Sequence, residues 1–270
     1  MDNAGILTLQ FNPKLNDKKA NLDKVYDLVS QYCDKQIDLV VLPEFFSTGI
    51  DDNAFKNSAE PVDGGETIGF LKNVAKRFNT NIVCGTVIVK DGENLYNTAF
   101  VLNRRGEIVN YYRKIHLYNY FGGNEGNTIT AGVEALVVDL DFAKVGVSVC
   151  FDIKFPMLYR KLIKMGAEII VSPSAWCNLN ILEEKQKLDY VTTWRAMNIC
   201  RATESLVYFV SSNQVGKSNK FLYCCGNSMI VAPMGEVLQN ACDKEDAIYA
   251  QISLKKVREL KINVPVAQLE

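Results

Sequence analysis

Cys150 is the residue of this chain whose surroundings most strongly indicate covalent chemistry. It closes the apolar run Ala143-Lys-Val-Gly-Val-Ser-Val-Cys and is followed at once by Phe-Asp-Ile-Lys-Phe-Pro. This pattern predicts a strand that turns into a helix at the thiol. A strand end opens onto a crevice and a helix start carries partial positive charge, so both features favour a thiolate nucleophile. The alternative is a buried, inert cysteine at the end of a core strand, and other residues must decide.

A cysteine nucleophile needs a base to accept its proton and donors to stabilise the oxyanion that forms on attack. Histidine is the usual base, and His116 is the one histidine of the chain. Glu44 is a second candidate because it follows the apolar run 37–42 and precedes two phenylalanines. Partial desolvation there would raise its pKa towards the range of a general base. Lys114 follows an apolar, aromatic segment and would face the same way as His116 in a strand.

Three motifs occur in order along the chain: Leu42-Pro-Glu-Phe-Phe-Ser-Thr-Gly, Tyr112-Arg-Lys-Ile-His-Leu and Val147-Ser-Val-Cys-Phe-Asp-Ile-Lys-Phe-Pro. Together they closely resemble the nitrilase superfamily of carbon-nitrogen hydrolases, and the resemblance covers nearly the whole chain. It implies a catalytic triad formed by Glu44, Lys114 and Cys150. It also implies a second glutamate in the loop after the lysine, seven residues before a glycine. Glu125 stands in that relation to Gly132.

The implied reaction hydrolyses a non-peptide carbon-nitrogen bond of a small amide through a thioester. Glu44 accepts the proton of Cys150, and the thiolate attacks the carbonyl carbon. Lys114 and the backbone N–H of Phe151 stabilise the oxyanion. Protonated Glu44 then donates to the leaving nitrogen, and water activated by Glu44 releases the acid. These steps require neither a metal nor an organic cofactor, so we expect none.

Residues near the nucleophile bear on substrate choice. Cys150-Phe151-Asp152 resembles the amidase and N-carbamoyl amidase branches, whereas Cys-Trp-Glu tends to mark nitrilases. Phe121 and Trp176 are candidate substrate-pocket residues, although large aromatic residues more often lie in a core or a subunit interface. We interpret Asp152 as an N-cap of the helix expected to begin near Phe155.

Composition agrees with an ordinary globular enzyme: 270 residues, 48% apolar and 23% charged. A formal net charge of −1 with dispersed Lys and Arg provides no basic patch for nucleic acid or an anionic membrane. The N-terminus lacks a secretory pattern and no apolar run approaches the roughly 20 residues of a membrane span, so we expect a cytoplasmic protein. The cysteines contain no C-x-x-C pair, which argues against a zinc site and a secreted disulfide framework. They lie at positions 33, 84, 150, 177, 200, 224, 225 and 242.

Strand and helix patterns alternate along the chain without a dividing linker, which predicts one domain over residues 1–268. We interpret Leu269-Glu270 as a vector remnant. Apolar spacing predicts helices around residues 22–32, 68–78, 155–165 and 184–203. Strands are expected at 4–11, 37–42, 81–89, 95–103, 107–113, 135–140, 144–150, 168–171, 206–213, 226–232 and 246–252. Such a mixture predicts an α/β (α+β) fold with two facing sheets and outer helices. The resemblance implies a four-layer α-β-β-α sandwich. It also implies that the protein forms a homodimer or higher even oligomer.

Four other functions remain open at this point. The first is a nitrilase or an N-carbamoyl amidase of the same superfamily, and the second is an acyltransferase in which an amine or thiol replaces water. The third is a cysteine hydrolase or transferase that uses His116 in place of Glu44 as the base of Cys150. The fourth is a catalytically silent binding or scaffold subunit that keeps the triad as a ligand pocket.

Overall fold

A computed structural model of the chain describes residues 2–120, 123–179 and 184–268. Its first strand, β1 (Asn3–Gln10), is buried along its whole length except at Asn3. Alternate side chains of a strand point to opposite faces. Ile6 accordingly joins the core between the sheets, whereas Leu7 and Leu9 join a second core beneath the outer helices. The continuous apolar run of β1 therefore fits a strand that is covered on both faces.

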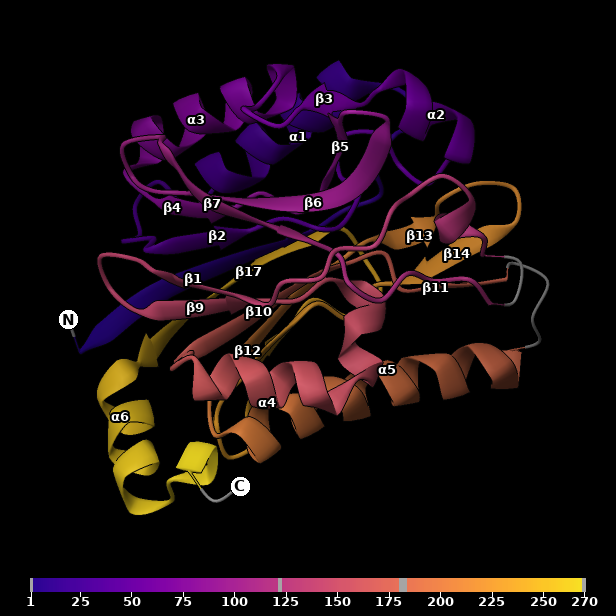
Figure 1. The fold of residues 1–270 in the computed structure, drawn as a ribbon. Helices are drawn as coiled ribbons and strands as arrows, with labels where there is room; N and C mark the ends of the chain where they lie inside the picture. The colour runs from indigo at the N-terminus through magenta and orange to yellow at the C-terminus, as the bar shows by residue number, and fades with distance from the viewer. Residues whose placement is uncertain (1, 121–122, 180–183, 269–270) are drawn as a thin grey trace.

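Two large sheets lie face to face (Figure 1). The first contains, in spatial order, β17 (Asp246–Ser253), β1, β2 (Leu39–Val41), β4 (Asn81–Val83), β6 (Asn94–Leu102), β5 (Val87–Asp91) and β3 (Glu60–Pro61), and β7 (Ile108–Arg113) also pairs with β6. The second contains β16 (Val237–Asn240), β15 (Met229–Val231), β12 (Tyr208–Asn213), β10 (Ile169–Ser174), β9 (Lys144–Val147) and β8 (Leu136–Asp139). A small third sheet at one end contains β11 (Cys177–Leu179), β14 (Leu222–Cys225) and β13 (Val215–Lys217).

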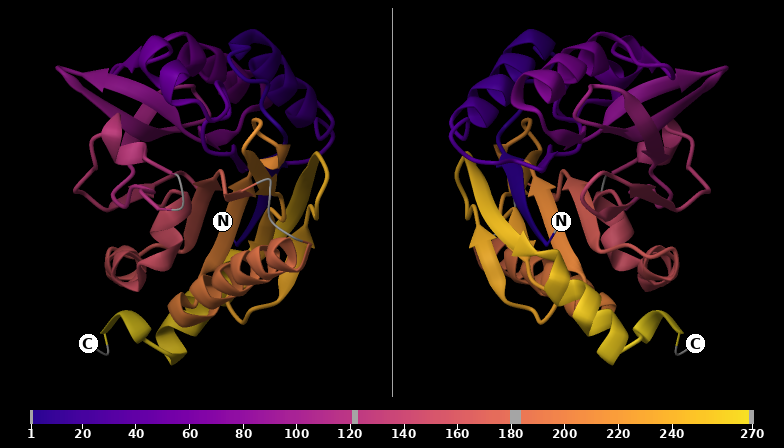
Figure 2. Two further views of the ribbon diagram at one scale, coloured as in Figure 1. Left: turned by 90° about the vertical axis from the view of Figure 1, so that its right-hand side faces the viewer. Right: turned by 90° about the vertical axis from the view of Figure 1, so that its left-hand side faces the viewer.

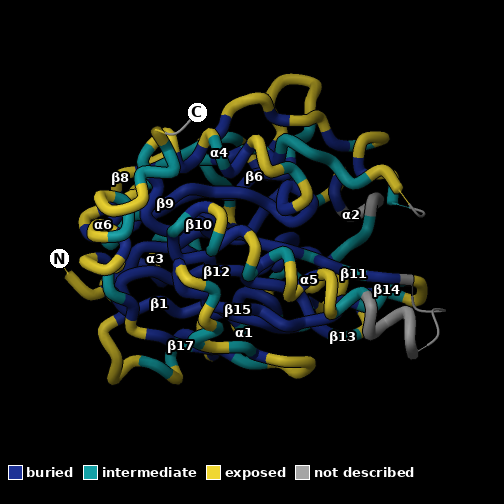
Figure 3. Tube along the Cα trace, turned by 90° about the horizontal axis from the view of Figure 1, so that it is seen from below, coloured by how far each residue is buried: buried dark blue, intermediate teal, exposed yellow. Residues whose placement is uncertain are grey.

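Helices cover both outer faces of the paired sheets. On the first sheet lie α1 (Lys18–Ser30) and α3 (Glu66–Phe78), and on the second lie α4 (Pro156–Lys164) and α5 (Glu184–Ser205) (Figures 1 and 2). The shorter helices are α2 (Asp52–Asn57), α6 (Leu254–Asn263) and the 3-10 turns η1 (Glu125–Asn127), η2 (Cys150–Lys154) and η3 (Val266–Gln268). This arrangement confirms the predicted four-layer α-β-β-α sandwich. Burial follows the same layers: Figure 3 shows buried strands inside the molecule and exposed segments concentrated on its outside.

Parallel strands set the position of the site. In the first sheet β1, β2 and β4 run parallel, and in the second β9, β10 and β12 do. Because the carboxyl ends of parallel strands meet at one edge of a sheet, the loops after β2, β9, β10 and β12 gather at one end of the sandwich. Strand β1 also contacts β12 of the facing sheet, since the Thr8 hydroxyl donates to the Ser211 carbonyl at 3.0 Å.

Several sequence expectations need correction. The strand expected at 81–89 is two strands, β4 and β5, because the chain turns at Gly85 with φ +49°. A Cβ there would lie 2.1 Å from the Pro43 carbonyl oxygen, so glycine allows this turn to pack against the segment before Glu44. The elements α2, β3, β11, β13, β14, β16 and α6 were missed. All of them except α6 have at most six residues, too few to show a clear period. Phe121 and Leu269-Glu270 lie outside the described residues.

Candidate active site

Four of the sequence-predicted residues come together at the strand ends. Glu44 follows β2, Lys114 follows β7, Glu125 begins η1, and Cys150 begins η2 after β9. Their exposed fractions are 1%, 2%, 8% and 7%, so all four are buried. The two sheets and two intervening loops thus bring three ionisable side chains and a thiol into one small volume.

Lys114 lies between the two glutamates. Its Nζ donates to Glu44 Oε1 at 2.9 Å and to Glu125 Oε2 at 2.8 Å. Burial alone would lower the pKa of Lys114, but the charges of Glu125 and Glu44 outweigh it and raise that pKa well above the ordinary value. Lys114 is therefore cationic at neutral pH. Because an ammonium group has three N–H bonds, one of them is left for a further acceptor.

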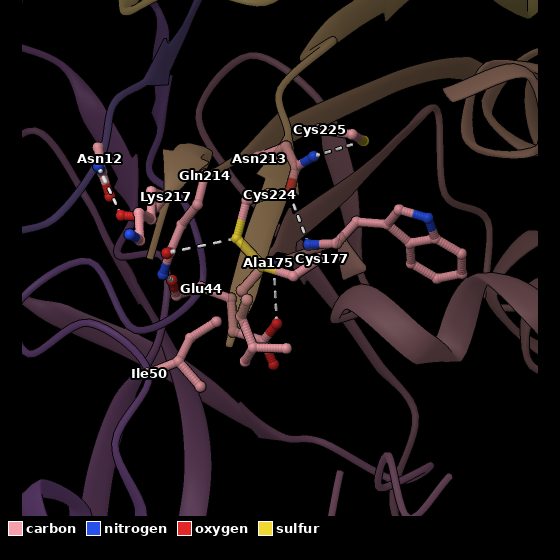
Figure 4. The surroundings of a disulfide bond; sticks show 12 residues. Asn12, Glu44, Ile50, Ala175, Cys177, Asn213, Gln214, Lys217, Cys224 and Cys225 are labelled. Atoms are coloured by element: carbon pink, nitrogen blue, oxygen red, sulfur yellow. Dashed lines mark hydrogen bonds between the residues drawn. A yellow bond between two sulfur atoms is a disulfide. The ribbon is translucent and has the colours of Figure 1, made fainter. Parts of the chain in front are cut away.

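Glu44 is held by groups from both sheets. The Ala175 N–H donates to Glu44 Oε2 at 2.9 Å, and Gln214 Nε2 donates to the Glu44 carbonyl oxygen at 2.7 Å (Figure 4). Burial raises the pKa of Glu44, the Lys114 charge opposes this rise, and the Glu125 charge adds to it, so the net shift is upward. The next residue, Phe45, has φ +52°, a left-handed conformation that is costly for a side chain other than glycine.

Cys150 lies close enough to Glu44 and to the Ala175 backbone for both groups to influence the pKa of its thiol. Its backbone has φ +49°, so this residue also occupies the left-handed region. Burial and the Glu44 charge raise the pKa of Cys150 well above its ordinary value, and the Lys114 charge only partly opposes them. The expectation that a helix start would favour the thiolate is therefore wrong: α4 begins six residues later, at Pro156, and the Glu44 charge raises the pKa of the thiol.

A residue that the sequence interpretation missed joins the two glutamates. Asn97, on β6, is 1% exposed, and its Nδ2 donates to Glu44 Oε1 at 2.8 Å and to Glu125 Oε1 at 2.9 Å. The signal that could have found it is a polar residue in the middle of Leu95-Tyr-Asn-Thr-Ala-Phe-Val. Its backbone carbonyl also accepts from the Lys114 N–H at 2.9 Å, which fixes the lysine to the same strand.

His116 has a different partner from the one a cysteine–histidine pair requires. Its Nδ1 lies 2.7 Å from Asp152 Oδ1, and its ring stacks on Phe155 with centroids 3.6 Å apart. Asp152 also accepts from the Tyr112 hydroxyl at 2.7 Å and from the Val149 N–H at 2.9 Å. The N-cap interpretation of Asp152 was wrong, since α4 has Phe155 as N-cap residue without a side-chain cap. Asp152 closes the η2 turn instead.

Trp176 directly follows Ala175 and is buried, with its ring stacked on Trp194 at 5.3 Å and near Tyr190 at 5.6 Å. Its indole Nε1 has no hydrogen-bond partner among the side chains that the structure describes. Lys154 Nζ lies 5.6 Å from the Trp176 ring centroid. Trp176 therefore combines a stacked ring with a buried indole donor that has no partner among the described residues.

A disulfide lies beside this segment. Cys177 and Cys224 face each other across β11 and β14 and are bonded (Figure 4). Cys224 Sγ also contacts Gln214 Oε1 at 3.8 Å, and Gln214 in turn donates to Glu44. Cys225, which directly follows Cys224, is a free cysteine, whereas the partner of Cys224 is 47 residues away.

Other features of the described chain lie away from these residues. A cavity of about 480 Å³ is lined by Lys35, Asp38, Arg104 and Asp141, among others, at the opposite, amino ends of β2 and β4. Three of its charged groups already pair with one another, because Arg104 contacts both Asp38 and Asp141. Among the described residues no cluster of three or more histidine, cysteine, aspartate or glutamate side chains could hold a metal ion. No helix of the described part combines the length and apolar character needed to cross a membrane.

Comparisons with known proteins agree with this geometry. Residues 8–262 match the family model described as carbon-nitrogen hydrolase. The chain is 30% identical to a 2-oxoglutaramate amidase of Bacillus subtilis, over 97% of this chain and 95% of that protein. It is 36% identical to a nitrilase of Pyrococcus abyssi, over 94% and 92%. The crystal structure of Nit3 from Saccharomyces cerevisiae, a member of branch 10 of the nitrilase superfamily, superposes with a TM-score of 0.86 at 25% identity, over 99% and 96%.

Proposed function

The chain belongs to the carbon-nitrogen hydrolase family and hydrolyses carbon-nitrogen bonds of amides, and we propose that it does so through a thioester on Cys150 with Glu44 as the base. The observation that carries this proposal is the buried cluster in which Lys114 binds both Glu44 and Glu125, beside a Cys150 thiol whose pKa the Glu44 charge raises. Because burial and the Glu44 charge raise the pKa of Cys150, the resting thiol is protonated and Glu44 must accept its proton for the sulfur to attack.

The catalytic steps follow from the hydrogen bonds. Glu44 takes the proton of Cys150, and the sulfur bonds to the carbonyl carbon of the amide. The negative charge that develops on the carbonyl oxygen meets the third N–H of Lys114 and the backbone N–H of Phe151. The loss of one such donor typically costs about 2.7 to 4 kcal/mol in the barrier. Protonated Glu44 then protonates the leaving nitrogen, the C–N bond breaks, and water activated by Glu44 cleaves the thioester to the acid.

We propose an amide that carries a carboxylate as the substrate. The relative in Bacillus subtilis is named for 2-oxoglutaramate, an acidic amide. In this chain Lys154 lies four residues after Cys150, and its ammonium group lies over Trp176. A cation at this position would attract the carboxylate of an amide bound at Cys150. Nitrile hydrolysis is the second candidate, because the relative in Pyrococcus abyssi is named a nitrilase.

The test is ammonia release and intact mass on a panel of acidic amides, neutral amides of equal size, N-carbamoyl compounds and nitriles, with the Cys150→Ala variant as control. We expect release from acidic amides that disappears in Cys150→Ala, together with an acyl adduct on the wild-type chain. Release from nitriles instead would favour the second candidate. Neither release nor adduct, with a thiol inert to iodoacetamide, would favour the binding subunit.

The pH dependence should report the Glu44 carboxyl. Glu44 must be ionised to accept a proton, and its pKa in the folded protein is raised from the ordinary value of about 4.3. Activity should therefore fall as pH decreases through that raised pKa, with the acid limb of kcat/KM above the usual carboxyl range. Because the pKa of Lys114 is raised, the lysine should produce no loss of activity up to about pH 10. An acid limb at pH 4 or below would contradict this assignment.

We also propose that the protein pairs as a homodimer or higher even oligomer through apolar side chains that are exposed on α4 and at the end of α6. Met157 on α4 and Ile262 on α6 are 73% and 79% exposed, and Val264 follows at 44%. We expect sedimentation velocity to give an even multiple of the chain mass, and Met157→Glu to lower it. Val133→Glu, at an equally exposed apolar position in the loop before β8, is the matched control. A wild-type monomer at all concentrations would contradict the proposal.

A further inference from the structure

Asn97 contacts two residues of the proposed mechanism but takes part in none of its chemical steps. One amide nitrogen donates to both carboxyl groups of the site, to Glu44 Oε1 at 2.8 Å and to Glu125 Oε1 at 2.9 Å. The two hydrogens of Nδ2 are thereby both used. The residue occupies a central strand of the first sheet, so its position is set by rigid backbone rather than by a loop.

The other end of this amide is left without a partner. Asn97 Oδ1 is buried and accepts no hydrogen bond from the residues that the structure describes. Turning the amide over would bring Oδ1 against two carboxylate oxygens, so the nitrogen must face them. A buried polar atom without a partner costs stability. Folding alone therefore does not account for an asparagine here, whereas a demand for two donors between two carboxylates does.

The hydrogen bonds that Glu44 accepts show how Asn97 affects the two oxygens of this carboxyl group. Oε1 of Glu44 accepts from both Lys114 and Asn97, which fills its two lone pairs. Oε2 accepts from the Ala175 N–H and keeps one lone pair free. The proton of the Cys150 thiol is thereby directed to Oε2. Glu125 is held in the same way, with Oε1 on Asn97 and Oε2 on Lys114 and the Tyr118 N–H.

We propose that Asn97 is a positioning residue for the proposed amide hydrolysis: it orients Glu44 and Glu125 from one amide so that only Oε2 of Glu44 faces the thiol. This inference rests on the proposed function. At Glu44, Asn97 fills the second lone pair of Oε1 beside Lys114. At Glu125 it holds Oε1, because Lys114 and the Tyr118 N–H both bind Oε2. Asn97 also stabilises both ionised carboxylates without adding a charge.

Asn81 provides a matched control in the same sheet. It is also 1% exposed, its Nδ2 also donates to two oxygens, Asp141 Oδ1 at 2.8 Å and the Asp38 carbonyl at 2.9 Å, and its Oδ1 is also unpaired. It lies at the start of β4, at the opposite end of the sandwich from Cys150. Asn81→Leu therefore reports the loss of a buried asparagine in this sheet without a change at the active site.

The experiment compares wild type, Asn97→Leu, Asn97→Asp and Asn81→Leu. For each we would measure kcat and KM for the hydrolysed amide between pH 4.5 and 9, thermal unfolding, and the rate of Cys150 alkylation by iodoacetamide from intact mass. We expect Asn97→Leu to lower kcat about 10²-fold with little change in KM, as for a misplaced catalytic group. Its acid limb should move up by about one pH unit, because the ionised carboxylates lose two donors. Asn97→Asp adds a third carboxylate, so its shift should be larger.

Two results would overturn the inference. One is a folded Asn97→Leu whose kcat and acid limb match those of Asn81→Leu, which would make Asn97 a packing residue. The second concerns Asn97→Asp, whose side chain has nearly the size of asparagine and which provides the same test if Asn97→Leu does not fold. An acid limb of Asn97→Asp at the same pH as in the wild type would overturn the inference. Failure of the proposed function is distinguishable because the wild type would then release no product. The pH at which the rate of Cys150 alkylation changes, compared between wild type and the Asn97 variants, would still show whether Asn97 governs proton transfer to Glu44.

Discussion

Replacing Glu44 with glutamine is expected to lower kcat/KM for an amide by about 10² to 10⁴, the usual contribution of a general base. Glutamine keeps the size of the side chain and one acceptor oxygen but cannot accept the proton of Cys150. The acyl adduct should form at a correspondingly lower rate. Lys114 keeps Glu125 as a partner at 2.8 Å, so the variant should remain folded, as a thermal unfolding measurement would confirm.

The matched control for this prediction is His116→Gln. Glutamine can still donate to Asp152, which is the partner of the His116 ring, so the η2 turn should persist. If Glu44 is the base, activity in this variant should stay close to that of the wild type. The reverse outcome, with activity lost in His116→Gln and kept in Glu44→Gln, would replace the proposed mechanism by a cysteine–histidine pair.

Replacing Lys114 with methionine is expected to abolish measurable turnover and to lower the free energy of unfolding by about 3 to 5 kcal/mol, the typical result of breaking a buried ion pair. The carboxylates of Glu44 and Glu125, 1% and 8% exposed, would lose their one cationic partner in the site. The oxyanion would also lose a donor. Urea unfolding and kcat/KM measured on the same preparations would test both effects.

The stability loss in Lys114→Met should depend on pH. Without the lysine charge the pKa of Glu44 in the folded variant rises further above its unfolded value. A group with a raised pKa favours folding below its unfolded pKa, and that contribution is lost as pH increases through the folded pKa. The deficit relative to wild type should therefore be smaller near pH 5 than at pH 8. Lys18→Met, which breaks the partly exposed pair of Lys18 with Glu60, is the comparison variant. A loss of unfolding free energy in Lys114→Met that does not depend on pH, or that equals the loss in Lys18→Met, would contradict the assignment of Lys114 as a buried cation.

Hydrophobic patterns in the sequence predicted the main elements well where the pattern extends over many residues. The helices around residues 68–78 and 184–203 were expected from spacing and are observed as α3 and α5. The strand at 4–11 was expected from an apolar run and is observed as β1. Short strands failed for a physical reason: β11 and β14 have three and four residues and depend on pairing with each other, which a local pattern does not contain.

The residue types of the site were also present in local sequence. Glu44, Lys114 and Cys150 stand inside short motifs whose order alone placed the chain in its family, and the resemblance added Glu125. Asn97 was missed because its neighbours form an ordinary strand, and its role depends on two carboxylates 53 and 28 residues away. The Ala175 N–H was missed because a backbone donor leaves no mark in the sequence.

The sequence by itself determined which reactive groups the chain has and in which order its motifs present them, because nucleophile, cation and carboxylates are properties of residue types. Only the tertiary structure decided how those groups act on one another. Burial and a carboxylate neighbour keep the Cys150 thiol protonated, although its place at a strand end favoured the thiolate. Proton affinity depends on solvent exclusion and on charges that folding brings within a few ångströms, and these come from segments far apart in the chain.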